Sequence, residues 1–191
     1  MGGQKTDIII FDRCLIRNEK TIMANDYLMS YTAAGLMYPE SLAIADAYLK
    51  TYEWEKTREQ ILSENLLQKR NPASIQRQRQ ELVKRLKTLN DDEIAELVAA
   101  DPDTQRKWLW TAICRTYPFI NELNSELLPE KAHSSDPFIT TADIRNFYDQ
   151  KSLDHPALRD YTETTREKLI TTAMRLMKQA EVLGEGGEIK I

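Results

Sequence analysis

The chain has 191 residues, of which 41% are hydrophobic and 29% are charged, enough to form the core of one domain or of two small packed domains. Its net charge of −4 argues against a protein that coats nucleic acid over its whole surface, but it allows a local basic patch. The longest apolar run is far shorter than the roughly 20 residues of a membrane helix, so we expect a cytoplasmic protein that makes no use of the membrane.

Helical periodicity dominates the sequence from Pro39 onward and predicts an all-α fold. Residues 6–17 are β-branched and apolar, and two isoleucines alternate after the final glycines, so minor β structure is expected at the N- and C-termini. Trp54 opens a short helix and is expected to be mostly buried, because so short a helix needs tertiary contacts. The first expected helix begins at Pro39. Further helices are expected at 54–62, 72–89, 91–100, 102–117, 119–128 and 140–150, and the last runs from Thr162 or Thr164 to Leu183.

These elements predict a bundle of small three-helix units of helix-turn-helix or winged-helix-like form. An N-terminal extension occupies 1–28, a three-helix unit with a basic helix 29–90, connecting helices 91–138 and a winged-helix-like unit 139–191. Thr164 and Glu167 have the spacing of a capping box at the start of the last helix.

The third expected helix is unusually basic for an acidic protein. Asn71 is suited to cap it, and Pro72 to occupy its first position. Between 69 and 87 there are seven Lys or Arg residues and one acid, Glu81, so this stretch carries +6 and the rest of the chain −10.

A helical projection separates two faces of this helix. The apolar face comprises Ile75, Leu82, Val83, Leu86 and Leu89. The opposite face holds only amides and bases, and Arg79 lies on the shoulder of the apolar face, where its guanidinium is expected to emerge into solvent. The opposite face comprises Gln76, Arg77, Gln80, Lys84 and Lys87.

These groups suit a DNA duplex, because Lys and Arg bind phosphates and Gln or Arg can read base edges in the major groove. In helix-turn-helix proteins the recognition helix occupies a comparable place, although the preceding turn is longer here than usual. The predicted nucleic-acid-binding residues are Lys69, Arg70, Gln76, Arg77, Arg79, Gln80, Lys84 and Lys87.

The basic helix also suits two roles that do not involve nucleic acid. Six acids follow between Asp91 and Asp103, so the helix can pair with them inside the fold. It can also dock onto an acidic protein partner. The sequence leaves both roles open.

The sequence shows no persuasive catalytic or metal-binding pattern. His133 and His155 are 22 residues apart and have no cysteine nearby, and Cys14 and Cys114 lack a metal-binding motif and are expected to be reduced. No phosphate-binding glycine loop is present. We therefore expect no enzymatic activity, no metal and no cofactor.

Several long stretches resemble the BrxA family of bacterial BREX phage-defence systems. The similarity covers roughly Tyr27 to Leu183, and its most characteristic piece is ENLLQKRNPASIQR, from Glu64 to Arg77. TTADIRNFYDQK and TETTREKLITTAMRLMKQAEVL are also of the family's kind, whereas residues 1–22 match nothing in it.

The resemblance implies an all-helical fold likened to the antitermination factor NusB, together with DNA association and a role in antiviral defence. It implies other BREX components as partners, namely a methyltransferase, an ATPase and a phosphatase-like protein. We therefore expect a non-enzymatic component that binds double-stranded DNA. The alternatives are an adaptor that docks a BREX enzyme through the basic helix, or NusB-like RNA binding.

Overall fold

The computed structural model describes residues 27, 29–63 and 72–190, and it is all-α, as predicted. The predicted N-terminal strand and the Asn71 cap lie outside these residues. The helices are α2 (Tyr38–Thr51), α3 (Trp54–Ser63), α4 (Pro72–Leu86), α5 (Asp91–Ala99), α6 (Pro102–Thr116), α7 (Pro118–Glu122), α8 (Leu128–Ala132), α9 (Thr141–Asp154) and α10 (Glu163–Gln179). Shorter turns are the 3₁₀ helices η1 (Ser30–Ala33) and η3 (Pro156–Asp160) and the π-helical turn η2 (Leu123–Leu127).

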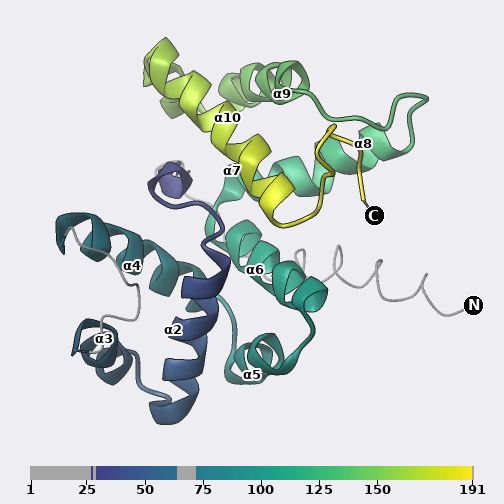
Figure 1. Ribbon diagram of the computed structural model, residues 1–191. Helices are drawn as coiled ribbons and strands as arrows, with labels where there is room; N and C mark the ends of the chain where they lie inside the picture. Colours follow the sequence, from purple (N-terminus) through teal and green to yellow (C-terminus); the bar gives the residue numbers. More distant parts are fainter. Residues whose placement is uncertain (1–26, 28, 64–71, 191) are drawn as a thin grey trace, which may run out of the picture.

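The helices form two groups that meet near the middle of the molecule (Figure 1). Helices α2 to α6 make the lower group in that view, and α7 to α10 make the upper one. η1 contacts both α4 and α10, so it joins the two groups. The predicted division of the chain into four segments stays a prediction.

Aromatic side chains fill the junction between the groups. Phe119 of α7 is fully buried; its ring stacks on Tyr31 of η1 at a centroid distance of 6.4 Å and lies 5.7 Å from Tyr148 of α9. Tyr31 also donates a hydrogen bond to the backbone carbonyl of Leu169 in α10 (3.2 Å). These contacts link η1, α7, α9 and α10 around one core.

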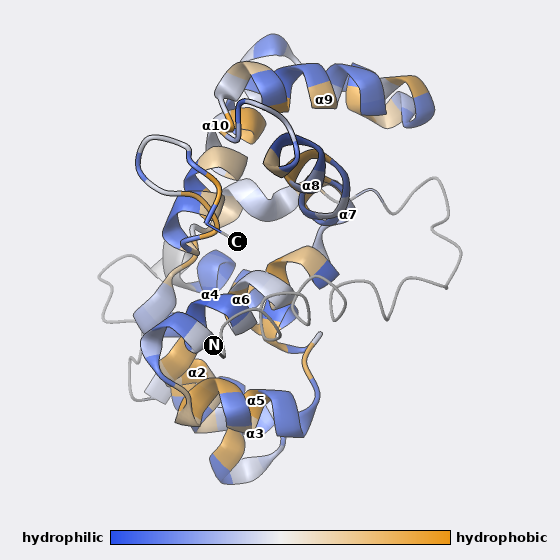
Figure 2. Cartoon of the chain, turned by 90° about the vertical axis from the view of Figure 1, so that its right-hand side faces the viewer, coloured by the Kyte–Doolittle hydropathy of each residue, from blue (hydrophilic) through white to orange (hydrophobic). Residues whose placement is uncertain are grey.

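The apolar residues lie on faces of the helices rather than along their whole length. Helices α2, α5 and α9 each carry both orange and blue stretches in Figure 2. In the described part of the chain, no helix combines the length and the apolar character needed to cross a membrane.

Caps and backbone conformation determine where the helices begin and end. Asn90 accepts a hydrogen bond from the backbone of Glu93 in a capping box that starts α5. The last helix ends at Gln179 instead of Leu183, because Glu181 adopts a left-handed conformation (φ 57°). Thr162 provides its cap, so the predicted capping box of Thr164 with Glu167 is wrong.

The segment after α10 folds back onto residues 137–139. In the described residues its β structure is limited to two isolated antiparallel bridges, Phe138 with Glu188 and Leu183 with Ile189. Gly187 is required at this turn, because its φ is +94° and a Cβ would lie 2.4 Å from the carbonyl oxygen of Ile139. The predicted β structure at the C-terminus is thus present in reduced form.

Trp54 is less buried than its place in a short helix predicted. It is partly buried, and its ring stacks on Tyr48 of α2 at a centroid distance of 4.1 Å. Among the α3 side chains that the structure describes, Thr57 and Ile61 are the buried ones. Trp54 is therefore less buried than these two residues, although its ring still contacts α2.

Candidate nucleic-acid interface

The inner face of α4 packs into the core as predicted. Leu82 and Leu86 are 1% exposed, Leu89 is buried just beyond the helix, and Val83 packs partly buried against them. The side chain of Ile75 lies outside the described part of the structure. This apolar stripe fixes which side of α4 faces solvent.

The opposite face of α4 is open and carries no acid. Four of the residues predicted on this face are exposed, as the helical projection requires: Gln76, Arg77, Gln80 and Lys87. The Lys87 ammonium lies 5.8 Å from the centroid of the Trp54 ring. In the described part of the chain, neither Arg77 nor Lys87 has a carboxylate partner, so both charges are available to a ligand.

Lys84 belongs to the same face but is already engaged. Its Nζ lies 3.1 Å from Glu81 Oε1 and donates a hydrogen bond to Ser30 Oγ at 3.0 Å. The ammonium also sits over the Tyr117 ring, 4.9 Å from its centroid. To bind a phosphate, Lys84 has to share or exchange these partners.

The predicted emergence of Arg79 is wrong, because this residue is only 3% exposed. A helical projection gives the direction of a side chain but not the depth of the neighbouring elements that cover it. Lys69 and Arg70, the two remaining predicted residues, lie outside the described part of the chain.

A buried polar network that the helical projection did not predict anchors α4. Arg85 is 3% exposed and donates from Nη1 to the carbonyl of Gly35 (2.6 Å), from Nη2 to that of Ala34 (2.9 Å) and from Nε to the Tyr117 hydroxyl (3.0 Å). The Tyr117 hydroxyl in turn donates to the Glu81 carboxylate.

Burial raises the pKa of Tyr117 well above its usual value, and its hydrogen bond to Glu81 acts in the same direction, so the phenol stays protonated as the donor. The only signal of this network in the sequence is that Glu81, the sole acid of the basic stretch, stands four residues before Arg85.

The acidic segment after α4 uses other partners for most of its carboxylates. Glu93 forms a bidentate ion pair with Arg115 of α6 (2.7 and 2.9 Å), and Asp91 accepts a hydrogen bond from the Tyr48 hydroxyl (2.8 Å). Asp101 caps α6, and Asp103 pairs with Arg106 (3.2 Å). Internal pairing with α4 therefore does not account for these four acids.

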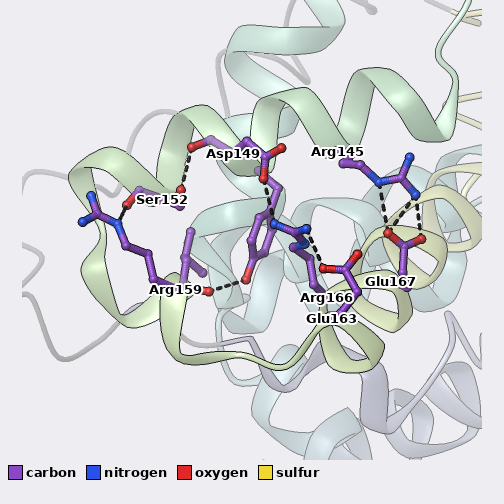
Figure 3. A network of polar contacts seen from close by, with 9 residues as sticks. Arg145, Asp149, Ser152, Arg159, Glu163, Arg166 and Glu167 are labelled. Carbon is purple, nitrogen blue, oxygen red and sulfur yellow. Dashed lines mark hydrogen bonds and ion pairs between the residues drawn. The ribbon is translucent and has the colours of Figure 1, made fainter.

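A second basic face runs along α10. Lys168 and Arg175 are exposed and, in the described part of the chain, have no carboxylate partner; Thr164 and Thr171 lie on the same side of the helix. The acidic residues of α10 pair with other arginines, as Figure 3 shows. Glu167 binds Arg145 of α9, and Glu163 binds Arg166 of α10 itself (2.6 Å).

Arg166 also reaches Asp149 of α9, at 3.1 Å (Figure 3). It is therefore part of the contact between α9 and α10 and is less available to a ligand than Lys168 or Arg175.

The chain is similar in fold to a solved structure and in sequence to a curated protein. The crystal structure of an uncharacterized protein from Magnetospirillum magneticum superposes with a TM-score of 0.72 at 18% identity, covering 86% of this chain and 85% of that one. A curated protein of Bacillus cereus (strain H3081.97), named BREX protein BrxA, is 22% identical over 157 residues, which cover 82% of this chain and 78% of that protein.

The model of the BrxA family matches residues 25–191, which include all of the helices discussed above. Residues 1–22, which do not resemble the family, lie outside this range. The chain belongs to the BrxA family.

Proposed function

We propose that this chain is a non-enzymatic, double-stranded-DNA-binding component of a BREX bacteriophage-defence system and acts alongside the other components of that system. The observation that carries the DNA proposal is the acid-free outer face of α4, on which Arg77, Lys87, Gln76 and Gln80 are all exposed. Membership of the BrxA family supports the place in a BREX system.

The uneven distribution of charge along the chain favours contact with DNA through one limited surface. The stretch from 69 to 87 carries +6 in a chain of −4, so the remainder carries −10 and repels a duplex. Lys69, Arg70, Arg77, Lys84 and Lys87 would contact phosphates, while Gln76 and Gln80 lie within the same face. Arg79, being buried, is removed from this contact set.

The salt dependence of affinity tests the proposal. If about five bases neutralise phosphates, the logarithm of the association constant falls with the logarithm of salt concentration at a slope near −4.5. Between about 50 and 200 mM salt the wild type then loses roughly 500-fold in affinity. The double variant Arg77→Gln with Lys87→Gln removes two contacts, so its slope should be near −2.7 and its loss roughly 40-fold.

A matched control is available on the second basic face. Lys168→Gln with Arg175→Gln removes the same two charges from exposed positions of α10 and should leave the slope near its wild-type value. Electrophoretic shift titrations over the same salt range, with circular dichroism to confirm folding, give all three slopes. A larger change in the α10 variant would move the DNA surface to that helix, and unchanged slopes in both variants would refute binding through either face.

A further inference from the structure

A pocket of about 570 Å³ lies where the two groups of helices meet. Its walls come from the segment that leads into α2, from α6, and from the end of α10 with the turn that follows it; in Figure 1 this turn lies above α6. Two contacts join the walls: the Leu36 amide donates to Gln179 Oε1 (2.9 Å), and Arg106 Nε lies 3.2 Å from Glu181 Oε1. None of the described lining residues belongs to α4, so the pocket is separate from the face proposed to bind DNA.

The pocket carries two ammonium groups whose charge is not neutralised by a carboxylate of the described residues. The Lys178 ammonium donates to the backbone carbonyl of Glu185. Lys190 is exposed, and its backbone amide donates to the carbonyl of Val182 (2.9 Å), which holds it beside the same turn. Both lysines line the pocket, and their charges are available to an anion.

The lining also offers apolar and planar surfaces. Leu36 and Leu183 are 3% and 1% exposed and form apolar parts of the wall. The Tyr38 ring is half-buried, and the Arg106 guanidinium lies over it, 5.2 Å from the ring centroid. Aromatic rings and guanidinium planes are surfaces on which nucleobases stack.

Strained backbone borders the pocket on two sides. Met37 (φ 49°) lines it on the α2 side and Glu181 (φ 57°) on the α10 side. The position after a helix end that adopts this left-handed conformation is usually glycine, and here it is a glutamate that pairs with Arg106. Backbone strain of this kind clusters at ligand sites, so it supports a binding role for the pocket.

We infer that this pocket binds a nucleoside monophosphate. Its volume lies within the range of small-molecule sites, about 300–1,000 Å³, and such sites are common where two units of a protein meet. A phosphomonoester carries nearly two negative charges at neutral pH, which match the ammonium groups of Lys178 and Lys190. The base packs against Tyr38 and Arg106, and the Glu185 carboxylate can accept hydrogen bonds from the ribose hydroxyls.

Isothermal titration calorimetry of the full chain with the 5′-monophosphates of adenosine, guanosine, cytidine and uridine tests the site. At least one of them should bind saturably, one molecule per chain, with a dissociation constant between about 10 μM and 1 mM. Inorganic phosphate and the matching nucleoside should each bind at least about tenfold more weakly, because each fills only part of the pocket. If none of the four binds saturably up to about 5 mM, the inference is wrong.

A pair of double variants locates the binding. Lys178→Gln with Lys190→Gln removes the two ammonium groups and should weaken nucleotide binding by about tenfold or more. The matched control, Lys168→Gln with Arg175→Gln, removes two exposed charges that do not line the pocket and should bind as the wild type does. Equal losses in the two variants would show a general effect of charge and rule out this site.

Glu181→Asn gives a test of opposite sign that does not depend on the lysine variant folding. Asparagine tolerates the left-handed conformation better than glutamate. The change removes a negative charge from the pocket and leaves Asp103 as the only carboxylate partner of Arg106 among the described residues. Nucleotide binding should therefore tighten by about threefold to tenfold, and unchanged or weaker binding would contradict the site.

Duplex titrations keep this site apart from DNA binding. Lys178→Gln with Lys190→Gln should leave the salt slope for duplex DNA near its wild-type value, because the pocket lies outside the α4 face. A flattened slope without any nucleotide binding would place the two lysines in the DNA contact and overturn the nucleotide site. Failure of the nucleotide site and failure of DNA binding therefore give different results.

Discussion

Helices α4 and α10 both present bases to solvent, yet they are attached to the protein in different ways. The inner face of α10 is apolar: Leu169, Ile170, Ala173, Leu176 and Met177 are at most 1% exposed. Its polar contacts, such as Glu167 with Arg145, lie at the surface. Helix α4 instead places Arg85 and Glu81 inside the protein, bound to Tyr117.

The charged residues of α4 therefore fall into two groups, one buried and one exposed. Arg85 and Glu81 fix the helix through hydrogen bonds that need a specific geometry, while Arg77 and Lys87 face solvent. On α10, Lys168 and Arg175 have no carboxylate partner among the described residues, and Arg166 contacts α9 through an ion pair with Asp149. Substitution of the hydrogen-bonded buried charges Arg85 and Glu81 should therefore damage the α4 region strongly, and substitution of Lys168 or Arg175 on α10 should have small effects.

The largest expected effect is that of Arg85→Ala. The change leaves two backbone carbonyls and the Tyr117 hydroxyl without their donor, and it leaves Glu81 less compensated, so we expect a loss of about 3–5 kcal/mol in the free energy of unfolding. Urea denaturation followed by circular dichroism measures it. The matched change Arg175→Ala on α10 should fall within about 0.5 kcal/mol of wild type. Equal losses in the two variants would remove the distinction between the helices.

The sequence was sufficient to predict the parts of α4 that depend on periodicity. The apolar stripe and the exposed positions follow from the helical repeat, and Pro72, Pro102 and Pro118 each lie at the start of a helix. Periodicity does not reveal burial by other elements. Arg85 bonds to Gly35, Ala34 and Tyr117, which lie 32 to 51 residues away along the chain, and the helical repeat indicates neither these contacts nor the burial of Arg79.

Trp54→Ala tests a second support of the α4 region. The ring stacks on Tyr48, and Lys87 lies over it, but the side chain is only partly buried. We therefore expect a loss of about 2–3 kcal/mol, below the roughly 3–5 kcal/mol that follows removal of a fully buried tryptophan. Trp54→Phe keeps an aromatic ring and should lose less than half as much in the same assay. A loss in Trp54→Ala as large as that in Arg85→Ala would place the main support of this region in the aromatic cluster.

Thr140→Ala should moderately lower the stability of α9, the helix that packs against α10. Thr140 caps α9 in a capping box with Asp143, and loss of such a cap costs about 1 kcal/mol. Burial alone would raise the pKa of Asp143, but hydrogen bonds from Thr140 and Lys131 more than offset it and hold the pKa below its usual value.

This lowered pKa adds a pH dependence. The stabilisation from Asp143 is present above the pKa of the unfolded chain, about 3.9, and is lost as the pH falls through the lower pKa of the folded protein. The difference in stability between wild type and Thr140→Ala should thus shrink on acidification below about pH 4. A difference that grows with acid would contradict the role of the Asp143 carboxylate.

The smallest expected effect concerns the ion pair between Arg145 and Glu167, and it gives the most direct contrast with Arg85. The Arg145 guanidinium makes three hydrogen bonds to the Glu167 carboxylate, at 2.7, 2.7 and 3.0 Å, as many as Arg85 makes in the core. The two side chains are, however, 39% and 37% exposed, so water and salt compete with each bond. A double-mutant cycle with Arg145→Met and Glu167→Gln should give a coupling of about 0.2–1 kcal/mol, which falls further at about 1 M salt. Hydrogen-bond number is the same at the two sites and burial differs, so a coupling of several kcal/mol that resists salt would show that burial is not what separates α4 from α10.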